Sequence, residues 1–115
     1  VGDMLQWGLI PPWSQDESGG DKLINCRSET AATKSSFRRA FRERRCLVPM
    51  NGFFEWTQDG QDRQPWFVSL KSSEPIGVAG LWESWKNPDE DQLGTFTLMM
   101  VDSNSFMAEF HDRMP

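Results

Sequence analysis

The feature that most constrains the fold is a succession of short apolar stretches that begins at Cys46 and ends at Val101. These stretches are rich in branched and aromatic side chains, a composition typical of β-strands. Asp-Gly, proline and clusters of acidic residues separate them, and such residues favour turns. The pattern predicts an antiparallel meander, with strands at residues 46–49, 52–56, 65–70, 76–85 and 95–101 and exposed turns at 57–64 and 87–94.

A short helix is expected before these strands. Within residues 35–45, Phe37, Ala40 and Phe41 recur at the spacing of one helical face. This segment therefore predicts an amphipathic helix that turns its arginines outward, with one of the two serines at its start as the N-cap.

The remaining segments complete the expected secondary structure. Residues 5–10 predict a short strand that ends at Pro11 and Pro12, because proline interrupts strand pairing. Residues 14–22 predict a polar, glycine-rich loop, and residues 103–110 a second short, capped helix. The fold class is therefore expected to be α+β, mainly an antiparallel β-sheet meander with short helices.

Length and composition predict one domain over residues 1–115, since the chain has no room for a second core. No run approaches the ~20 apolar residues of a membrane span, and no signal segment opens the chain, so no membrane is expected as a partner. Cys26 and Cys46 are expected to be reduced, which indicates a cytoplasmic location. We expect a monomer. Because the sequence starts with Val1, it is also expected to be a piece of a longer protein, truncated at both ends.

The charges are distributed unevenly. The net charge of −5 by itself argues against a nucleic-acid partner. However, seven of the twelve lysines and arginines lie in residues 27–45, here called the basic island, together with only two acidic residues. Such a concentration is typical of a surface that binds phosphate. The alternative is a solvated helix face whose arginines pair with nearby acids.

Three polar positions are candidates for chemistry. His111, the only histidine, is either a solvated loop residue or a proton-transfer group. Glu55 lies within an aromatic strand and is either exposed or a partly desolvated acid suited to proton transfer. In residues 23–30, Asn25 can orient a polar group and Arg27 can bind a phosphate. The alternative for that segment is a turn that caps a helix.

A metal site is not expected. One histidine and two cysteines that are twenty residues apart supply no pair of zinc ligands, and no glycine-rich phosphate loop is present. We therefore expect neither a metal nor a cofactor. A thiol hydrolase that uses Cys26, next to Asn25 and Arg27, is a further alternative.

Eight short segments, in this order along the chain, resemble the SOS response-associated peptidase (SRAP) family. Each segment is weakly specific alone, but eight collinear segments over nearly all 115 residues are highly specific. They read WGLIPPW, INCRSET, SFRRAF, RRCLVPMNGFFEW, QPWFV, AGLWESW, TFTLMMVDSN and HDRMP.

The resemblance implies a DNA-repair enzyme that crosslinks to abasic sites in single-stranded DNA. In that family the α-amine of an N-terminal cysteine attacks the ring-opened sugar aldehyde to form an imine, and the thiol then closes a thiazolidine. An α-amine is partly neutral at pH 7 and therefore nucleophilic, and ring closure is intramolecular.

The resemblance also implies roles for particular residues. Asn25 would position the N-terminal cysteine, Glu55 would shuttle protons, and His111 would assist opening of the sugar ring. A face that binds single-stranded DNA would be formed by Trp13, Arg27, Arg38, Arg39 and Arg113.

The chain departs from the family pattern in three places. Cys26 stands where alanine is usual, and Phe54 stands where tyrosine is common. Val1 is not the reactive cysteine, so the chain as given is expected not to form the crosslink. Two other functions stay open, namely a peptidase that only removes its own N-terminal segment and a non-catalytic single-stranded DNA-binding module.

Overall fold

The computed structural model describes residues 3–59, 62–87, 89 and 91–115. Eight strands, one α-helix and two 3₁₀ helices are formed by these residues. In chain order they are β1 (Gln6–Trp7), η1 (Gly20–Lys22), β2 (Asn25–Arg27), α1 (Arg38–Glu43), β3 (Arg45–Met50), β4 (Phe53–Asp59), β5 (Asp62–Val68), β6 (Ile76–Lys86), β7 (Gln92–Asp102), η2 (Met107–Glu109) and β8 (Arg113–Met114).

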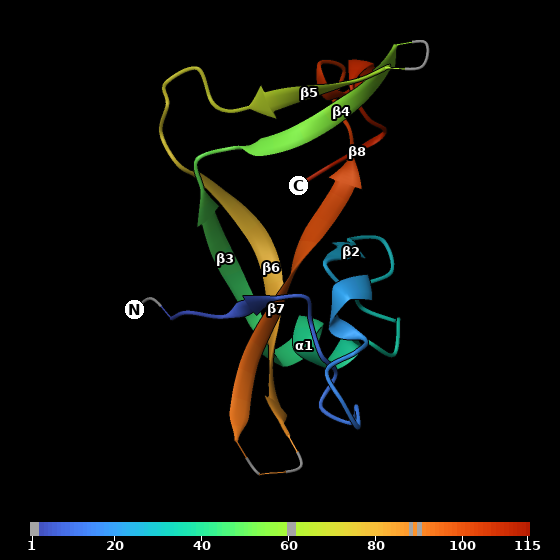
Figure 1. Cartoon of the computed structure of the whole chain (residues 1–115), viewed down its shortest axis with the longest axis vertical. Helices are drawn as coiled ribbons and strands as arrows, with labels where there is room; N and C mark the ends of the chain where they lie inside the picture. The colour runs from blue at the N-terminus through green and yellow to red at the C-terminus, as the bar shows by residue number, and fades with distance from the viewer. Residues whose placement is uncertain (1–2, 60–61, 88, 90) are drawn as a thin grey trace.

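The larger sheet is organised around β7. This strand pairs with β6 and β8 in antiparallel fashion, and β6 pairs with β3 in the same way. The short strands β1 and β2 instead lie parallel to β7 (Figure 1). The expected α+β class and the mainly antiparallel sheet are confirmed, and the two parallel pairs are an addition that the meander pattern does not contain.

Strands β4 and β5 form a separate two-stranded sheet. Their register pairs Phe54 with Phe67 and Glu55 with Trp66. Figure 1 shows this hairpin at the end of the larger sheet where β8 lies. The predicted Asp-Gly turn includes Gly60, which lies outside the described residues.

The core lies between α1, the loops around β1 and β2, and the centre of β6. Leu81 of β6 is fully buried, and Phe37 and Ala40 are buried beside it, as the helical spacing predicts. The whole buried cluster consists of Leu9, Cys26, Ala31, Phe37, Ala40 and Leu81. Packing of this apolar face, and not helix propensity, stabilises a helix as short as α1.

The helix is shorter than expected and begins differently. It runs from Arg38 to Glu43, with Phe37 at the N-cap and no side-chain cap hydrogen bond, so the expected cap by Ser35 or Ser36 is wrong. The reason is a run of turns before the helix, in which the amides of Phe37 and Arg38 donate to the Lys34 carbonyl. These bonds use the amide groups that a serine cap would otherwise satisfy.

Two other expected elements are also shorter. The predicted strand at 5–10 is reduced to Gln6–Trp7, because Gly8 has φ of 113° and turns the chain away from β7. A side chain at Gly8 would meet the Gly20 carbonyl oxygen at 2.5 Å. The predicted helix at 103–110 is the 3₁₀ helix η2, whose N-cap residue Phe106 makes no side-chain cap hydrogen bond, so the expected cap is wrong. The Met107 amide instead donates to Asn104 Oδ1 at 2.8 Å.

Both cysteines are free thiols, Cys26 buried and Cys46 half-buried. Among the described residues, the helices lack the length and the apolar character that crossing a membrane requires.

Replacing Leu81 with alanine tests the position of the core. We expect Leu81→Ala to lower the free energy of unfolding by ~2–5 kcal/mol, because a fully buried leucine leaves a cavity in close-packed surroundings. The matched control is Leu47→Ala on β3, where the leucine is 75% exposed and the change is expected to stay within ~0.5 kcal/mol. Chemical denaturation measures both, and equal effects would contradict this description of the core.

Candidate functional site

A pocket of about 290 Å³ lies where β2, the segment before α1 and the C-terminal segment meet. We call it the β2 pocket. Four residues that the sequence singles out reach it from separate parts of the chain, namely Asn25, Arg27, His111 and Arg113. The complete lining is Asn25, Cys26, Arg27, Thr30, Lys34, Phe37, Met100, His111 and Arg113.

Strand β2 presents two of these side chains by simple alternation. It pairs with Leu98–Met100 of β7, so its successive residues point to opposite faces. Cys26 is buried at 1% exposure, whereas Asn25 and Arg27 are exposed. Burial raises the pKa of the Cys26 thiol to about 11, which keeps it protonated at neutral pH and argues against its use as a nucleophile.

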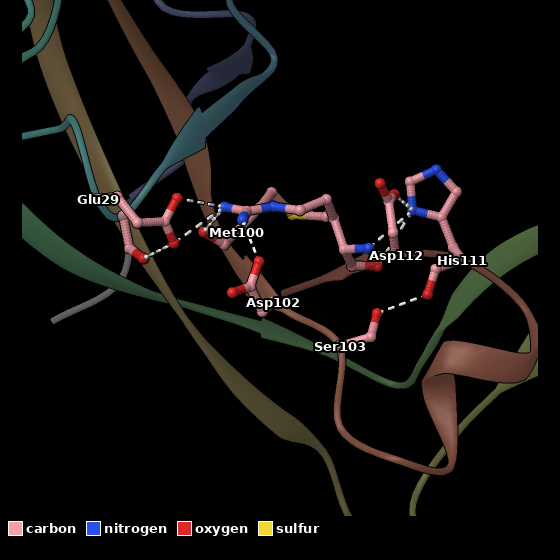
Figure 2. A network of polar contacts seen from close by, with 8 residues as sticks. Glu29, Met100, Asp102, Ser103, His111 and Asp112 are labelled. Atoms are coloured by element: carbon pink, nitrogen blue, oxygen red, sulfur yellow. Dashed lines mark hydrogen bonds and ion pairs between the residues drawn. The ribbon is translucent and has the colours of Figure 1, made fainter.

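Arg113 is held by two carboxylates. Its Nη2 donates to Glu29 Oε2 at 2.9 Å and to the Met100 carbonyl at 2.8 Å, and its Nη1 donates to Asp102 Oδ1 at 2.8 Å (Figure 2). The Arg113 side chain is only 13% exposed. The implied contact of Arg113 with a DNA phosphate stays a prediction, and these bonds favour a structural role because the guanidinium charge is already compensated.

The same network shifts the titration of its members. The hydrogen bond from Arg113, and then that from Ser28, hold the pKa of Glu29 below its ordinary value. The bond to Glu29 in turn raises the pKa of Arg113. Both directions favour the charged forms, as expected for an arginine that bonds to a carboxylate.

His111 lies at the edge of the pocket with its side chain 48% exposed. Its Nδ1 accepts a hydrogen bond from the Arg113 amide at 3.0 Å and lies 3.2 Å from Asp112 Oδ1. Its main chain is also anchored, since its carbonyl accepts a bond from Ser103 Oγ at 2.6 Å. The ring is thus placed by local contacts, while its partly exposed surface stays accessible to a ligand.

Glu55 is not among the residues that line the β2 pocket. It lies half-buried on β4, opposite Trp66 of β5. The Trp66 ring meets the Phe110 ring edge-on at 5.7 Å, which brings the hairpin against the residue before His111. Glu55 is therefore connected to the histidine through this aromatic contact.

The expected DNA-binding face is divided. Arg27 and Arg113 belong to the β2 pocket, whereas Trp13, Arg38 and Arg39 line a second hollow of about 910 Å³, here called the α1 groove. Its complete lining is Trp13, Ala32, Ser35, Arg38, Arg39, Phe41, Arg42 and Arg45. The tryptophan is 60% exposed beside these arginines, an arrangement suited to base stacking and phosphate contact.

The basic island also contains the ion pairs that the alternative interpretation expects. Glu43 lies 3.5 Å from Arg39, 3.6 Å from Arg42 and 3.4 Å from Arg44. The pairs of Arg39 and Arg42 are exposed, so each contributes little to stability and leaves these arginines able to exchange partners. Arg44 is half-buried and also lies 3.6 Å from the buried Glu83.

Two residues of the β2 pocket were not singled out by the sequence, Thr30 and Lys34. Lys34 belongs to the basic island, but the sequence did not indicate that this lysine lines the pocket. Its Nζ lies 5.7 Å from the centre of the Phe37 ring. The signal that could have found it is its position four residues before Arg38, which places both on one side of a helical turn.

The residues that the structure describes contain no group of three or more His, Cys, Asp or Glu side chains arranged to hold a metal ion.

The model for the family described as SOS response associated peptidase (SRAP) matches residues 1–115. Among curated proteins, the chain is 44% identical to the abasic site processing protein YoqW of Bacillus subtilis, over 96% of this chain and 50% of that protein. It is 30% identical to the abasic site processing protein HMCES of Xenopus tropicalis, over 96% of this chain and 40% of that protein. The chain thus spans about half the length of YoqW and less of HMCES.

Two crystal structures have similar folds. A protein from Bacteroides thetaiotaomicron superposes with a TM-score of 0.91 at 30% identity, over 96% of this chain and 51% of that one. A protein from Bordetella bronchiseptica gives a TM-score of 0.86 at 25% identity, over 96% and 58%.

Replacing Glu29 with glutamine tests the carboxylate network through pH. Because the pKa of Glu29 is lower in the folded chain, its stabilisation is present above the ordinary value of 4.5 and is lost as pH falls through the lowered folded value. We therefore expect the parent chain to be more stable than Glu29→Gln at pH 7, and the two free energies of unfolding to converge in acid.

Denaturation at a series of pH values measures this difference. The matched control is Glu74→Gln, an exposed glutamate outside the network, which is expected to follow the parent curve. A constant difference between the parent and Glu29→Gln at every pH would contradict the ion pair.

Proposed function

This chain belongs to the SRAP family, and we propose that it forms the part of a DNA-repair protein that recognises abasic sites in single-stranded DNA. The observation that carries the proposal is the β2 pocket, in which Asn25 and Arg27 of β2 meet His111 of the C-terminal segment. Its relatives YoqW and HMCES are named abasic site processing proteins, which supports the same substrate.

The charges of the β2 pocket suit a sugar-phosphate ligand. Arg113 is compensated by Glu29 and Asp102, whereas Arg27 and Lys34 form no ion pair with the described residues. Two cations that no described carboxylate pairs with, beside one cavity, attract a phosphate group. We assign phosphate binding in this pocket to Arg27 and Lys34, in place of Arg113.

The α1 groove extends this surface for the rest of the strand. Lys34 lines the β2 pocket, and Arg38, one helical turn later, lines the α1 groove. A bound strand would pass from one to the other over this turn, with its phosphates near the two cations and a base stacked on Trp13. Such binding depends mainly on charge and little on base sequence.

The chemistry proposed for the complete protein is the thiazolidine crosslink. The α-amine of an N-terminal cysteine adds to the aldehyde carbon of the opened sugar, and water leaves as the imine forms. The thiol sulfur then adds to the imine carbon, and its proton is transferred to the nitrogen. His111 would protonate the ring oxygen as the sugar opens, Asn25 would orient the cysteine, and Glu55 would carry protons for the loss of water.

Two other functions lead to different results. A peptidase that only processes its own N-terminus would form no DNA adduct. A non-catalytic single-strand binder would bind with or without a lesion, and its affinity would not change in Glu55→Gln or His111→Ala. The basic island and Trp13 favour a single-strand binder over a peptidase alone, but they do not explain the convergence of Asn25 and His111.

A denaturing gel tests the crosslink. An oligonucleotide with one abasic site is incubated with the 115-residue chain and with a version extended to the length of its relatives that begins with cysteine. We expect a shifted band only with the extended version, and none with an oligonucleotide that lacks the lesion. In the extended version, Glu55→Gln and His111→Ala should slow the reaction by ~10²–10⁴-fold, the usual range for acid–base catalysis.

The absence of a shifted band with either protein would contradict crosslinking and would favour the binder or the self-processing peptidase. Cleavage of the N-terminal segment without DNA would then identify the peptidase.

The salt dependence of binding tests the role of Lys34. For single strands, each phosphate contact contributes about 0.7 to the slope of log affinity against log salt concentration. We expect Lys34→Ala to reduce this slope by about 0.7 with the 115-residue chain and an abasic oligonucleotide. The matched control is Lys71→Ala, an exposed lysine in the turn between β5 and β6, which should leave the slope unchanged. Equal slopes for both variants would exclude a phosphate contact at Lys34.

A further inference from the structure

The carboxylate network and the histidine are joined through one residue, Arg113. Its side chain bonds to Glu29 and Asp102, while its main-chain amide donates to His111 Nδ1 at 3.0 Å (Figure 2). The side chain and the amide belong to one residue of β8, so the carboxylates that hold the guanidinium also help to hold the donor that meets the imidazole.

The amide donor determines which ring nitrogen carries the proton. A neutral imidazole has one N–H group and one nitrogen that accepts. A backbone amide can only donate, so the contact from the Arg113 amide requires an unprotonated Nδ1. The proton of the neutral His111 ring therefore lies on Nε2, which points away from the network in Figure 2.

Two neighbouring oxygen atoms would favour the other tautomer, which carries the proton on Nδ1. Asp112 Oδ1 lies 3.2 Å from Nδ1 and the Arg113 carbonyl oxygen lies 3.3 Å from it, and either would accept a hydrogen bond from a protonated Nδ1. Both contacts are longer than the one from the amide, and the Asp112 side chain is 89% exposed and thus hydrated. The amide contact is therefore expected to determine the tautomer of the neutral ring.

The main chain on both sides of the ring is fixed as well. The His111 amide donates to the Met107 carbonyl at 3.0 Å, and the Ser103 amide donates to the Asp112 carbonyl at 3.1 Å. Because the Asp112 carbonyl and the Arg113 amide belong to one planar peptide group, the bond from Ser103 holds this amide from one side, and the anchored side chain of Arg113 holds it from the other.

We propose that Glu29 and Asp102 are positioning residues that act through Arg113 to hold the neutral ring of His111 as the tautomer protonated on Nε2. This state presents an N–H donor on the side of the ring that is free of the network. The use of that donor rests on the proposed function, in which it delivers a proton to the sugar of an abasic site. The tautomer itself does not depend on that function.

Nitrogen NMR of the imidazole is the first test, because the chain contains a single histidine and its ring signals need no assignment. Spectra are recorded with the 115-residue chain at alkaline pH, where imidazole is neutral. We expect the parent chain to be almost entirely protonated on Nε2. Glu29→Gln and Asp102→Asn should move the ring towards the mixture of a solvated imidazole, and hydrogen exchange at the Arg113 amide should accelerate at least about tenfold.

The matched control is Asp112→Ala. It removes the competing acceptor beside Nδ1 but leaves the bonds of Arg113 in place, so it should keep the Nε2-protonated form and slow amide exchange. Backbone amide spectra show whether each variant folds. If Glu29→Gln does not fold, Asp102→Asn is used in its place. A ring protonated on Nδ1 in the parent chain would overturn the proposal, and so would an unchanged tautomer and exchange rate in both network variants.

The crosslinking assay separates this inference from the proposed function. In the extended version, Glu29→Gln should slow crosslinking by up to about 10²-fold, the scale of a misplaced catalytic group. If the tautomer and exchange change while the rate does not, the positioning of the ring stands and its role in proton transfer is wrong.

Discussion

Hydrogen bonding to β7 is the constraint on which the rest of the structure depends. β6 and β8 pair with this strand in antiparallel fashion, and β1 and β2 pair with it in parallel. The Leu98 amide donates to the Ile24 carbonyl, and the Met100 carbonyl accepts both from the Ser28 amide and from Arg113. One strand therefore brings the segment of Asn25 and the segment of His111 to the same place, although 86 residues separate them along the chain.

The division of charge at the site follows from this arrangement. Because β7 carries Asp102 next to β8, Arg113 is paired with a carboxylate as soon as the two strands pair. Glu29 completes the compensation from the turn after β2. The cations left for an anionic ligand are those of the basic island, Arg27 and Lys34 in the β2 pocket and the arginines of the α1 groove. The ion pairs of Arg113, which stabilise the fold, therefore lie beside the cations that we assign to ligand binding.

Sequence patterns predicted the long elements better than the short ones. Strands β3 to β7 agree with the apolar stretches to within a few residues, because runs rich in branched and aromatic side chains favour an extended backbone. No strand was predicted at β2, since two exposed polar residues around one buried cysteine carry no strand signal by themselves. The capping of α1 was wrong for a similar reason, because the turns after Thr30 had already used the amides concerned.

By itself, the sequence determined the α+β class, the apolar face of the helix, the concentration of basic residues and the resemblance that pointed to Asn25, Glu55 and His111. These depend on residue type and spacing, which are local properties. Only the tertiary structure decided that Asn25 and His111 share a pocket, that Glu55 lies outside its lining on the hairpin that Trp66 joins to Phe110, and that Arg113 is held by two carboxylates. Such facts depend on which strands pair with β7, and pairing between distant segments is set by the packing of the whole chain.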